Sequence, residues 1–207
     1  MIKIIDYKAG NGPSVLHAVE KIGFQGELVA APEGLESASC IILPGVGSAG
    51  ATMSSLRQSG MAEALGEYVI NRKIPFLGVC VGLQILFEHS EEEDAHCFGW
   101  LKGRVRKFDS SEVRVPQMGW NNVSFVNDAP LAAQDGYFYF VNSYYAKLED
   151  PADVWGTAQY GGQFAAAVCR GNIYATQFHV EKSGEAGLRL LKGFLTLAVQ
   201  REARAKC

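Results

Sequence analysis

The sequence predicts an α/β fold in a single domain spanning 1–207, with an open, mostly parallel sheet that is flanked by helices and extended by antiparallel strands in its second half. Three observations lead to this prediction. The first half alternates short apolar runs with helical spacing, and the second half holds closely spaced aromatic and β-branched runs. A chain of 207 residues with 48% hydrophobic residues also suits one domain with a full core.

The first half predicts buried strands that are each followed by a turn. The strands cover 2–6, 28–30, 40–43 and 76–79. Helical spacing runs over 13–22, where Gly23 marks the stop, over 61–69, and again after Cys80. This alternation favours parallel βαβ units, in which ligands lie beyond the carboxyl ends of the strands. We therefore expect the turns after the first, third and fourth strands to lie along one edge.

The second half predicts short antiparallel strands that are separated by turn residues. The runs cover 103–108, 121–126, 137–141, 154–160, 163–168 and 173–178. A last helix should begin near Ser183, which is a suitable N-cap. Its buried face should consist of Leu188, Leu191, Leu195 and Ala198.

Composition narrows the classes of function. The net charge of −3 gives no reason to expect binding to nucleic acid or to an anionic membrane, and no run approaches the roughly 18 apolar residues of a membrane span. Five widely spaced cysteines without a CxxC pair argue against a disulfide framework and against a zinc site. We expect a cytoplasmic protein that acts on small molecules or binds another protein, with no metal and no cofactor.

Cys80 is the residue that points most directly to chemistry. It lies in GVCVGLQ, residues 78–84, between a predicted strand and a predicted helix, with a glycine two residues to each side. This layout matches the strained elbow that exposes a nucleophile above a sheet. The N-terminus of the helix would favour a thiolate, and the backbone N–H of Val81 is placed to donate to an oxyanion. A buried cysteine in a glycine-rich turn is the alternative.

A thiolate nucleophile needs a base, and the base needs a group that orients it. Of the four histidines, His179 ends an aromatic strand, and Glu181 follows on the same side of an extended chain. The other three histidines are interpreted as surface residues. Cys80, His179 and Glu181 therefore form a candidate triad. The alternative for the HxE segment is a capping histidine beside a surface carboxylate.

Six segments, in order along the chain, resemble the class I, triad-type glutamine amidotransferases. Within that family they resemble the glutaminase subunits of imidazole glycerol phosphate synthases. The segments are 2–11 (ending DYKAGN), 43–50 (LPGVGSAG), 78–84 (GVCVGLQ), 115–123 (VPQMGWNNV), 139–145 (YFVNSYY) and 175–184 (ATQFHVEKSG).

The resemblance implies that Cys80 attacks the side-chain amide of glutamine, while His179 carries the proton and Glu181 orients His179. It implies an oxyanion site in which the backbone of Val46 and Gly47 joins that of Val81. Glycines at 45 and 47 would let this segment reorient when the partner binds its own substrate. The positions that hold the substrate glutamine in the family match Gln84, Glu92, Ser143 and Tyr144. A solvated acidic turn is the alternative for the segment around Glu92.

The resemblance also implies a partner. Family glutaminases form a heterodimer with a (β/α)8 barrel cyclase, or synthase, subunit, and the released ammonia passes through a shielded channel into the barrel. The motifs that face the barrel contain Asn11, Met118, Trp120, Asn121 and Lys182. Trp120 on an exposed loop suits an interface hot spot, and packing in the core is the alternative.

The chain departs from the family pattern at several positions. Val180 stands where the family has a proline, and Gln117 and Asn142 stand where it commonly has histidines. Lys8 replaces a glycine near the expected interface. Val180 should change the rigidity of the segment between His179 and Glu181 rather than remove activity. The changes at Gln117 and Asn142 put docking of the partner in doubt.

Three other functions remain open from the sequence. One is a class I glutaminase that serves another pathway, which the combination of PGVG, PQMGWN and YFVNSYY disfavours. Another is a stand-alone cysteine hydrolase such as a γ-glutamyl hydrolase, which would need no partner. The last is a binding subunit without turnover, which the presence of all three triad residue types disfavours.

Overall fold

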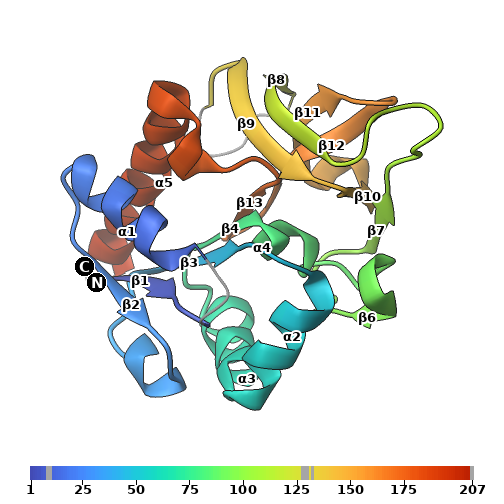
Figure 1. Cartoon of the computed structure of the whole chain (residues 1–207). Coiled ribbons are helices and arrows are strands. Elements are labelled where there is room, and N and C mark those ends of the chain that lie inside the picture. Colours follow the sequence, from blue (N-terminus) through green and yellow to red (C-terminus); the bar gives the residue numbers. More distant parts are fainter. Residues whose placement is uncertain (8–10, 127–130, 132, 206–207) are drawn as a thin grey trace.

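The strands of the computed structural model form one extended sheet around a parallel core. The structure describes residues 1–7, 11–126, 131 and 133–205, so Lys8 lies outside the described residues. The strand order is β2-β1-β3-β4-β13-β12-β10-β7-β5-β6 (Figure 1). The parallel core consists of β2 (Gly26–Val29), β1 (Ile2–Ile5), β3 (Cys40–Gly45), β4 (Phe76–Cys80) and β13 (Ile173–Thr176). The predicted α/β fold with a parallel sheet is confirmed.

Antiparallel strands extend this core, as the second half of the sequence predicts. They are β12 (Gln163–Arg170), β10 (Tyr144–Leu148), β7 (Gly103–Lys107), β6 (Ala95–His96), β11 (Val154–Gln159), β8 (Gln117–Phe125) and β9 (Gly136–Asn142). The strand β5 (His89–Ser90) pairs with β6 in antiparallel fashion and with β7 in parallel.

Two strand predictions need correction. We expected the last run to be antiparallel, but β13 is antiparallel only to β12 and is parallel to β4, with Tyr174 opposite Leu77. All four residues of β13 are buried, and a run that is buried on both faces suits the interior of a mixed sheet. The sequence analysis also missed β10, because only Ser143 separates β9 from β10 and no glycine or proline marks the break.

Helices cover both faces of the core. The helices α1 (Gly12–Lys21) and α5 (Gly184–Ala205) contact each other on one face, and α2 (Ala49–Gln58) and α3 (Met61–Leu65) lie together on the other (Figure 1). A π turn (Gly66–Asn71) follows α3. Shorter elements are α4 (Val81–Gln84) and 3₁₀ turns at Pro32–Leu35, Glu92–Asp94, Pro151–Asp153 and Val180–Lys182. None of the helices in the described part is long and apolar enough to cross a membrane.

The helix predicted after Cys80 is wrong in length. Only one turn forms, because the carbonyl groups that would continue the helix accept hydrogen bonds from a later segment. The N–H groups of Phe98, Gly99 and Leu101 donate to the carbonyl oxygens of Ile85, Phe87 and Leu86. Cys80 therefore precedes a single helical turn and not a longer helix.

One helix was not predicted, and the predicted start of another is confirmed, because α5 begins at Gly184, directly after Ser183. The sequence analysis missed α2, whose N-cap Ser48 accepts a hydrogen bond from the N–H of Ala51 at 3.2 Å. Ser183 does precede α5, but its hydroxyl donates to the carbonyl oxygen of His179 at 2.6 Å and accepts from the N–H of Tyr139 at 2.9 Å. Ser183 therefore ties the end of the HxE segment to β9 instead of capping the helix.

The junction between β4 and α4 is held by close backbone contacts to β3. A Cβ atom added at Gly82 would overlap the carbonyl oxygen of Leu43, and one added at Gly78 would overlap the carbonyl oxygen of Gly82. A Cβ atom at Gly45 would lie 2.7 Å from the backbone nitrogen of Gly82. Only glycine fits at these three positions, so the turn that carries Cys80 packs directly against the neighbouring strand.

We expect Gly82→Ala to lower the free energy of unfolding by about 1–3 kcal/mol, because the added methyl group forces α4 away from β3. Urea unfolding followed by circular dichroism measures this change. Gly66→Ala is the control, since Gly66 has helical φ and ψ and no atom lies within 4 Å of its added Cβ. The control should raise the free energy of unfolding by up to about 1 kcal/mol. Equal effects of the two changes would contradict the proposed packing.

Candidate active site

Cys80 lies at the carboxyl end of β4 in a strained backbone conformation. Its φ of 56° and ψ of −107° place a residue with a side chain in a region that favours glycine. The thiol lies 3.8 Å from the carbonyl oxygen of Val141, and the side-chain amide of Gln177 lies 3.7 Å from Sγ. The elbow predicted from GVCVGLQ is therefore present. Close contacts require the glycines at its sides, Gly82 against Leu43 of β3 and Gly78 against the backbone of Gly82.

His179 and Glu181 form a buried hydrogen-bonded pair. The Nδ1 atom of His179 lies 2.8 Å from Oε1 of Glu181, and the two side chains are only 3% and 1% exposed. Asn11, from the start of α1, donates from Nδ2 to the same carboxylate oxygen at 2.7 Å. The HxE segment forms a 3₁₀ turn at Val180–Lys182, and not the extended chain that we expected, yet the turn still brings the two side chains together.

The environment of this pair favours a charged imidazole. Burial lowers the pKa of His179, but its hydrogen bonds to Cys80 and Glu181 and the charges of both groups raise the pKa to about 9. For Glu181, burial raises the pKa, but the hydrogen bond and charge of His179 and the hydrogen bond from Asn11 leave it below its ordinary value. The imidazole therefore holds a proton firmly at neutral pH and is positioned to give it to a leaving nitrogen.

A cavity of about 300 Å³ opens beside Cys80. Its wall is formed by Val46, Gly47, Cys80, Val81, Gln84, Glu92, Pro116, Val141, Asn142, Ser143, Tyr144, His179 and Lys182. The turns after β3 and β4 line this cavity, as we expected from the parallel topology, and Asn11, which follows β1, contacts Glu181 beside it. Among the described residues, no cluster of three or more His, Cys, Asp or Glu side chains is arranged to hold a metal ion.

The segment expected to complete an oxyanion site lies on the wall of this cavity. Gly47 has a φ of 96°, and no atom lies within 4 Å of where its Cβ would stand. Gly45 differs, because it pairs with Cys80 in the β3–β4 ladder and is packed against Gly82. The freedom to reorient that the sequence assigned to both glycines is therefore open only to Gly47.

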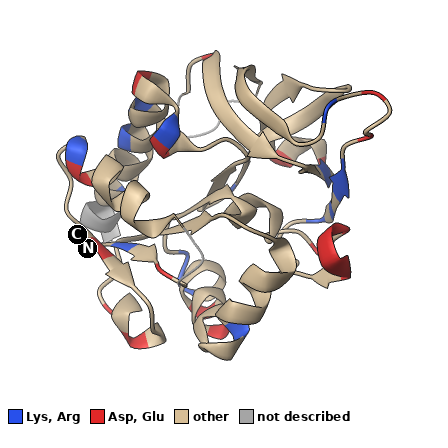
Figure 2. Ribbon diagram, viewed as in Figure 1, with Lys and Arg blue, Asp and Glu red and all other residues tan. Residues whose placement is uncertain are grey.

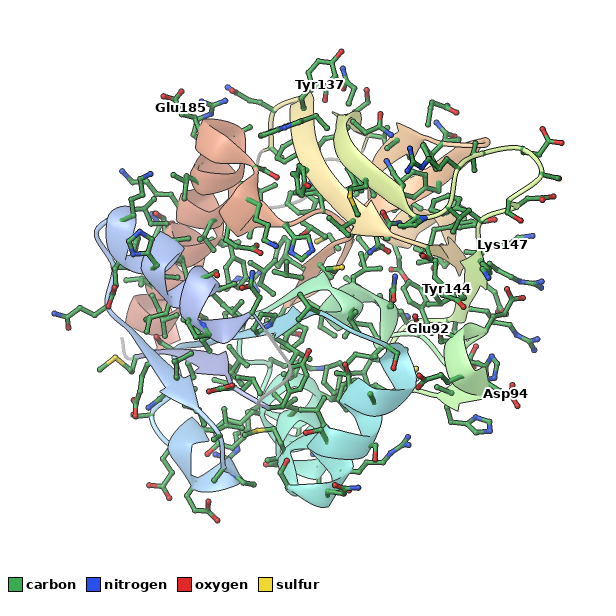
Figure 3. The ribbon with its side chains drawn as sticks, in the orientation of Figure 1. Glu92, Asp94, Tyr137, Tyr144, Lys147 and Glu185 are labelled. Carbon is green, nitrogen blue, oxygen red and sulfur yellow. The ribbon has the colours of Figure 1, made fainter. Side chains whose placement is uncertain are left out.

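All four residues expected to hold a substrate line the cavity. The side chains of two of them also form hydrogen bonds with other residues of the chain. Gln84 is buried and donates from Nε2 to the carbonyl oxygen of Tyr144 and to Oε1 of Gln177, both at 3.1 Å. Glu92 accepts from the N–H of Ala49, the first residue of α2, at 2.8 Å. Glu92 and Tyr144 lie on the same side of the molecule, as Figure 3 shows.

Glu92 differs from its acidic neighbours in its environment. It is half-buried, whereas Glu91, Glu93 and Asp94 are exposed. Burial raises the pKa of Glu92, the N–H of Ala49 lowers it, and the charge of Glu93 raises it again. The interpretation of this run as a wholly solvated turn therefore fails at Glu92.

Sequence reasoning missed several residues of the site. Gln177 is fully buried and connects Gln84 to Cys80, and Pro116, Val141 and Asn142 form part of the wall. For Gln177 a signal existed, because it stands two residues before His179 at the end of the same strand. For the other three, only the pairing of β8 with β9 brings them beside Cys80.

The residues expected at a partner interface fall into two groups. Met118 and Trp120 project from one face of β8 and are 67% and 56% exposed, so Trp120 lies on a strand and is not part of the core. Asn121 points to the other face and donates to the carbonyl oxygen of Gln159 at 2.9 Å. Asn11 holds Glu181, and Lys182 lines the cavity. Figure 2 shows that β8 and β9 carry no charged residue.

Comparison with known proteins gives the family. The model of the family described as "Glutamine amidotransferase class-I" matches residues 3–197. The chain belongs to the class I glutamine amidotransferase family. It is 46% identical over 207 residues to a protein of Herpetosiphon aurantiacus named "Imidazole glycerol phosphate synthase subunit HisH", with 97% of this chain and 96% of that protein covered. A protein of the same name from Leptospira interrogans is 42% identical, with 95% and 100% covered.

Solved structures show that this amidotransferase shares its fold with more distant proteins. The structure of PurLQS from Thermotoga maritima has a TM-score of 0.77 at 21% identity, with 95% of this chain and 97% of that chain covered. A structure titled as that of a glutamine amidotransferase has a TM-score of 0.76 at 20% identity, with 95% and 98% covered.

In this amidotransferase, Glu181→Gln should lower the pKa of His179 below about 9, because burial is then opposed only by Cys80 and no longer by the carboxylate. A nuclear magnetic resonance titration of the imidazole measures this pKa. Glu185→Gln is the control, since Glu185 is exposed at the start of α5. A pKa that stays near 9 in the Glu181→Gln variant would show that this carboxylate does not set it.

The stability of the amidotransferase should depend on pH through the same pair. The folded chain keeps the His179 proton until about pH 9, whereas the unfolded chain releases it near 6.5. This stabilisation is complete below about pH 6.5 and is lost as the pH rises through 9. The difference in free energy of unfolding between the chain and Glu181→Gln should therefore shrink from about pH 6 to about pH 10 in urea titrations. A difference that is independent of pH would contradict this linkage.

Proposed function

We propose that this chain is the glutaminase subunit of imidazole glycerol phosphate synthase, acting in histidine biosynthesis in the cytoplasm. Its partner would be a (β/α)8 barrel synthase subunit that uses the ammonia to make imidazole glycerol phosphate and an aminoimidazole carboxamide ribotide. The observation that carries the proposal is the meeting of Cys80, at its strained position, with the buried His179–Glu181 pair beside one cavity. Near full-length identity of 46% and 42% to two proteins named HisH supports it.

The triad would cleave glutamine in two steps. His179 has already taken the thiol proton when Sγ of Cys80 bonds to the side-chain carbonyl carbon. The C–N bond then breaks, the proton passes from His179 to the nitrogen, and ammonia leaves a glutamyl thioester. Water then bonds to the thioester carbon while His179 takes one of its protons, and the C–S bond breaks. Glutamate leaves, and the proton from water replaces the one that left with ammonia. Glu181 keeps Nδ1 of His179 occupied, so that the other ring nitrogen serves Cys80.

The oxyanion of each tetrahedral intermediate needs hydrogen-bond donors. The N–H of Val81 is the first of α4 and has no acceptor within that helix. The peptide between Val46 and Gly47 lies on the same wall, and the positive φ at Gly47 leaves this peptide able to turn. We infer that these two positions supply the donors.

Charge in the cavity suits a zwitterionic amino acid. Glu92 provides a carboxylate for an α-ammonium group, and Lys182 provides an ammonium group for an α-carboxylate. The volume of about 300 Å³ lies at the lower end of the range for ligand sites, which fits one amino acid. Glutamine satisfies both requirements and presents its side-chain amide to Cys80.

The partner would dock on the uncharged ribbon of β8 and β9. Met118 and Trp120 from β8 and Tyr137 from β9 expose large apolar side chains, and Tyr137 projects from the ribbon in Figure 3. Met118 stands opposite Val141, the residue whose carbonyl contacts Cys80, so this surface lies directly behind the cavity wall. Exposed apolar groups of this kind mark sites of protein binding.

Cys80→Ala should lower the rate of glutamate formation from glutamine by about 10⁴-fold or more, because no other group replaces the thiol as nucleophile. The rate is measured for the purified chain alone and with its synthase subunit and the ribotide substrate. Cys97→Ala is the matched control, since Cys97 lies outside the cavity and should leave the rate unchanged. Turnover that persists in the Cys80→Ala variant would contradict the proposed mechanism.

The same assay separates the proposal from the alternatives. Slow hydrolysis alone and fast hydrolysis in the complex supports a glutaminase that its partner activates. Fast hydrolysis without a partner would instead indicate a stand-alone hydrolase. No hydrolysis under either condition would indicate a binding subunit.

Trp120→Ala should weaken binding of the synthase subunit by about 30-fold or more, because it removes the largest exposed aromatic side chain of the ribbon. Isothermal titration calorimetry with the purified synthase subunit measures the affinity. Val199→Ala on α5 removes an exposed apolar group away from the ribbon and should leave the affinity unchanged. If both variants bind as tightly as the original chain, the ribbon is not the docking surface.

A further inference from the structure

Gln117 and Asn142 form a pair of buried amide side chains beside the active site. They stand opposite each other in the β8–β9 ladder, so their side chains lie on the same face of the ribbon. Their exposed fractions are 3% and 5%. Asn142 lines the cavity that contains Cys80, and Pro116, the residue before Gln117, lines it as well.

The side-chain oxygen of each amide has no hydrogen-bond partner among the described residues. These atoms are Oε1 of Gln117 and Oδ1 of Asn142. The orientation of the Asn142 amide is fixed, because its nitrogen donates to the carbonyl oxygen of Tyr144 at 2.9 Å. That carbonyl accepts only, so the amide cannot be turned over without losing this bond. A buried acceptor without a partner is costly, and it indicates a ligand that donates.

The position of the pair identifies the donor. The thiol of Cys80 lies 3.8 Å from the carbonyl oxygen of Val141, which is the residue directly before Asn142. The nitrogen that is released when the thioester forms at Cys80 therefore departs close to Asn142, and Gln117 stands opposite Asn142 in the ladder. Ammonia and ammonium carry several N–H donors and can reach two acceptors at once. Amide oxygens hold such a donor without taking or giving a proton, so they leave ammonia free to react.

We propose that Gln117 and Asn142 hold the ammonia that is released at Cys80 before it leaves the cavity. This inference rests on the proposed glutaminase function and adds a site for its nitrogen product. The site lies on the inner side of the ribbon whose outer side exposes Met118 and Trp120, and so between the thioester and the proposed docking surface.

The return of ammonia to the thioester tests the inference. In this reverse step the nitrogen bonds to the thioester carbon and the C–S bond breaks, which regenerates glutamine and the thiol. The full chain in complex with its synthase subunit is given glutamine and ammonium labelled with heavy nitrogen, without the ribotide that would consume ammonia. Mass spectrometry measures label in the remaining glutamine, and the same samples give glutamate. The ratio of exchange to hydrolysis reports how well ammonia is held near the thioester.

Gln117→Met removes the acceptor at nearly constant size and should lower this ratio by about five- to tenfold, the effect of losing one hydrogen bond. Gln117→Glu keeps an acceptor at the same place and should retain the ratio or raise it. Gln159→Met is the matched control, because it makes the same substitution at an exposed position of β11 outside the cavity and should leave both rates unchanged.

The outcomes distinguish the inference from the function on which it rests. A ratio that is the same in all variants overturns the holding site, whether or not the absolute rates change, because a structural role would lower exchange and hydrolysis together. A lower ratio in Gln117→Glu as well would also overturn it, since the acceptor is then not what matters. Absence of glutamate from the unaltered complex, also in a parallel sample that contains the ribotide, would overturn the glutaminase itself. Gln117→Met should unfold no earlier than the original chain, because the oxygen that it removes has no described partner.

Discussion

The site depends on how closely the turn after β4 approaches β3. At Gly45, Gly78 and Gly82 the backbones approach so closely that a methyl group would collide with them. This contact holds Cys80 at a positive φ, which by itself costs about 1–3 kcal/mol, and the buried strands around it offset that cost. The thiol therefore stands at a fixed point at the carboxyl edge of the parallel core. The other groups of the site are arranged around that point.

Burial sets the electrostatics of the site. Asn11, His179 and Glu181 come from opposite ends of the chain, and they meet where water is excluded from the two charged side chains. In such surroundings a charge is stable only with a partner, and each member of the pair supplies what the other needs. The neutral side chains of Gln84 and Gln177 are also paired beside Cys80, because Nε2 of Gln84 donates to Oε1 of Gln177. Gln117 and Asn142 are the contrasting case, because the side-chain oxygen of each has no hydrogen-bond partner among the described residues.

Sequence periodicity predicted the elements whose signals are local. The strands β1 to β4, the helix α1 with its stop at Gly23, and the elbow around Cys80 all follow from residue spacing within about ten positions. The prediction failed where long-range contacts decided. The helix after Cys80 stops after one turn because the segment 98–101 takes its carbonyl groups, and Ser183 binds β9 instead of capping α5. The helix α2 was missed because small residues dominate it and weaken its apolar pattern.

By itself, the sequence predicted the candidate triad of Cys80, His179 and Glu181, since these residues stand in motifs whose chemistry follows from residue type and spacing. It also predicted the first four strands of the parallel core, because alternating strands and helices admit few other arrangements. Only the tertiary structure decided which face of β8 carries Trp120 to the surface and which side of β9 brings Asn142 to the cavity. Those choices depend on strand register, because a shift of one residue exchanges the two faces, and the local sequence does not encode the partner strand.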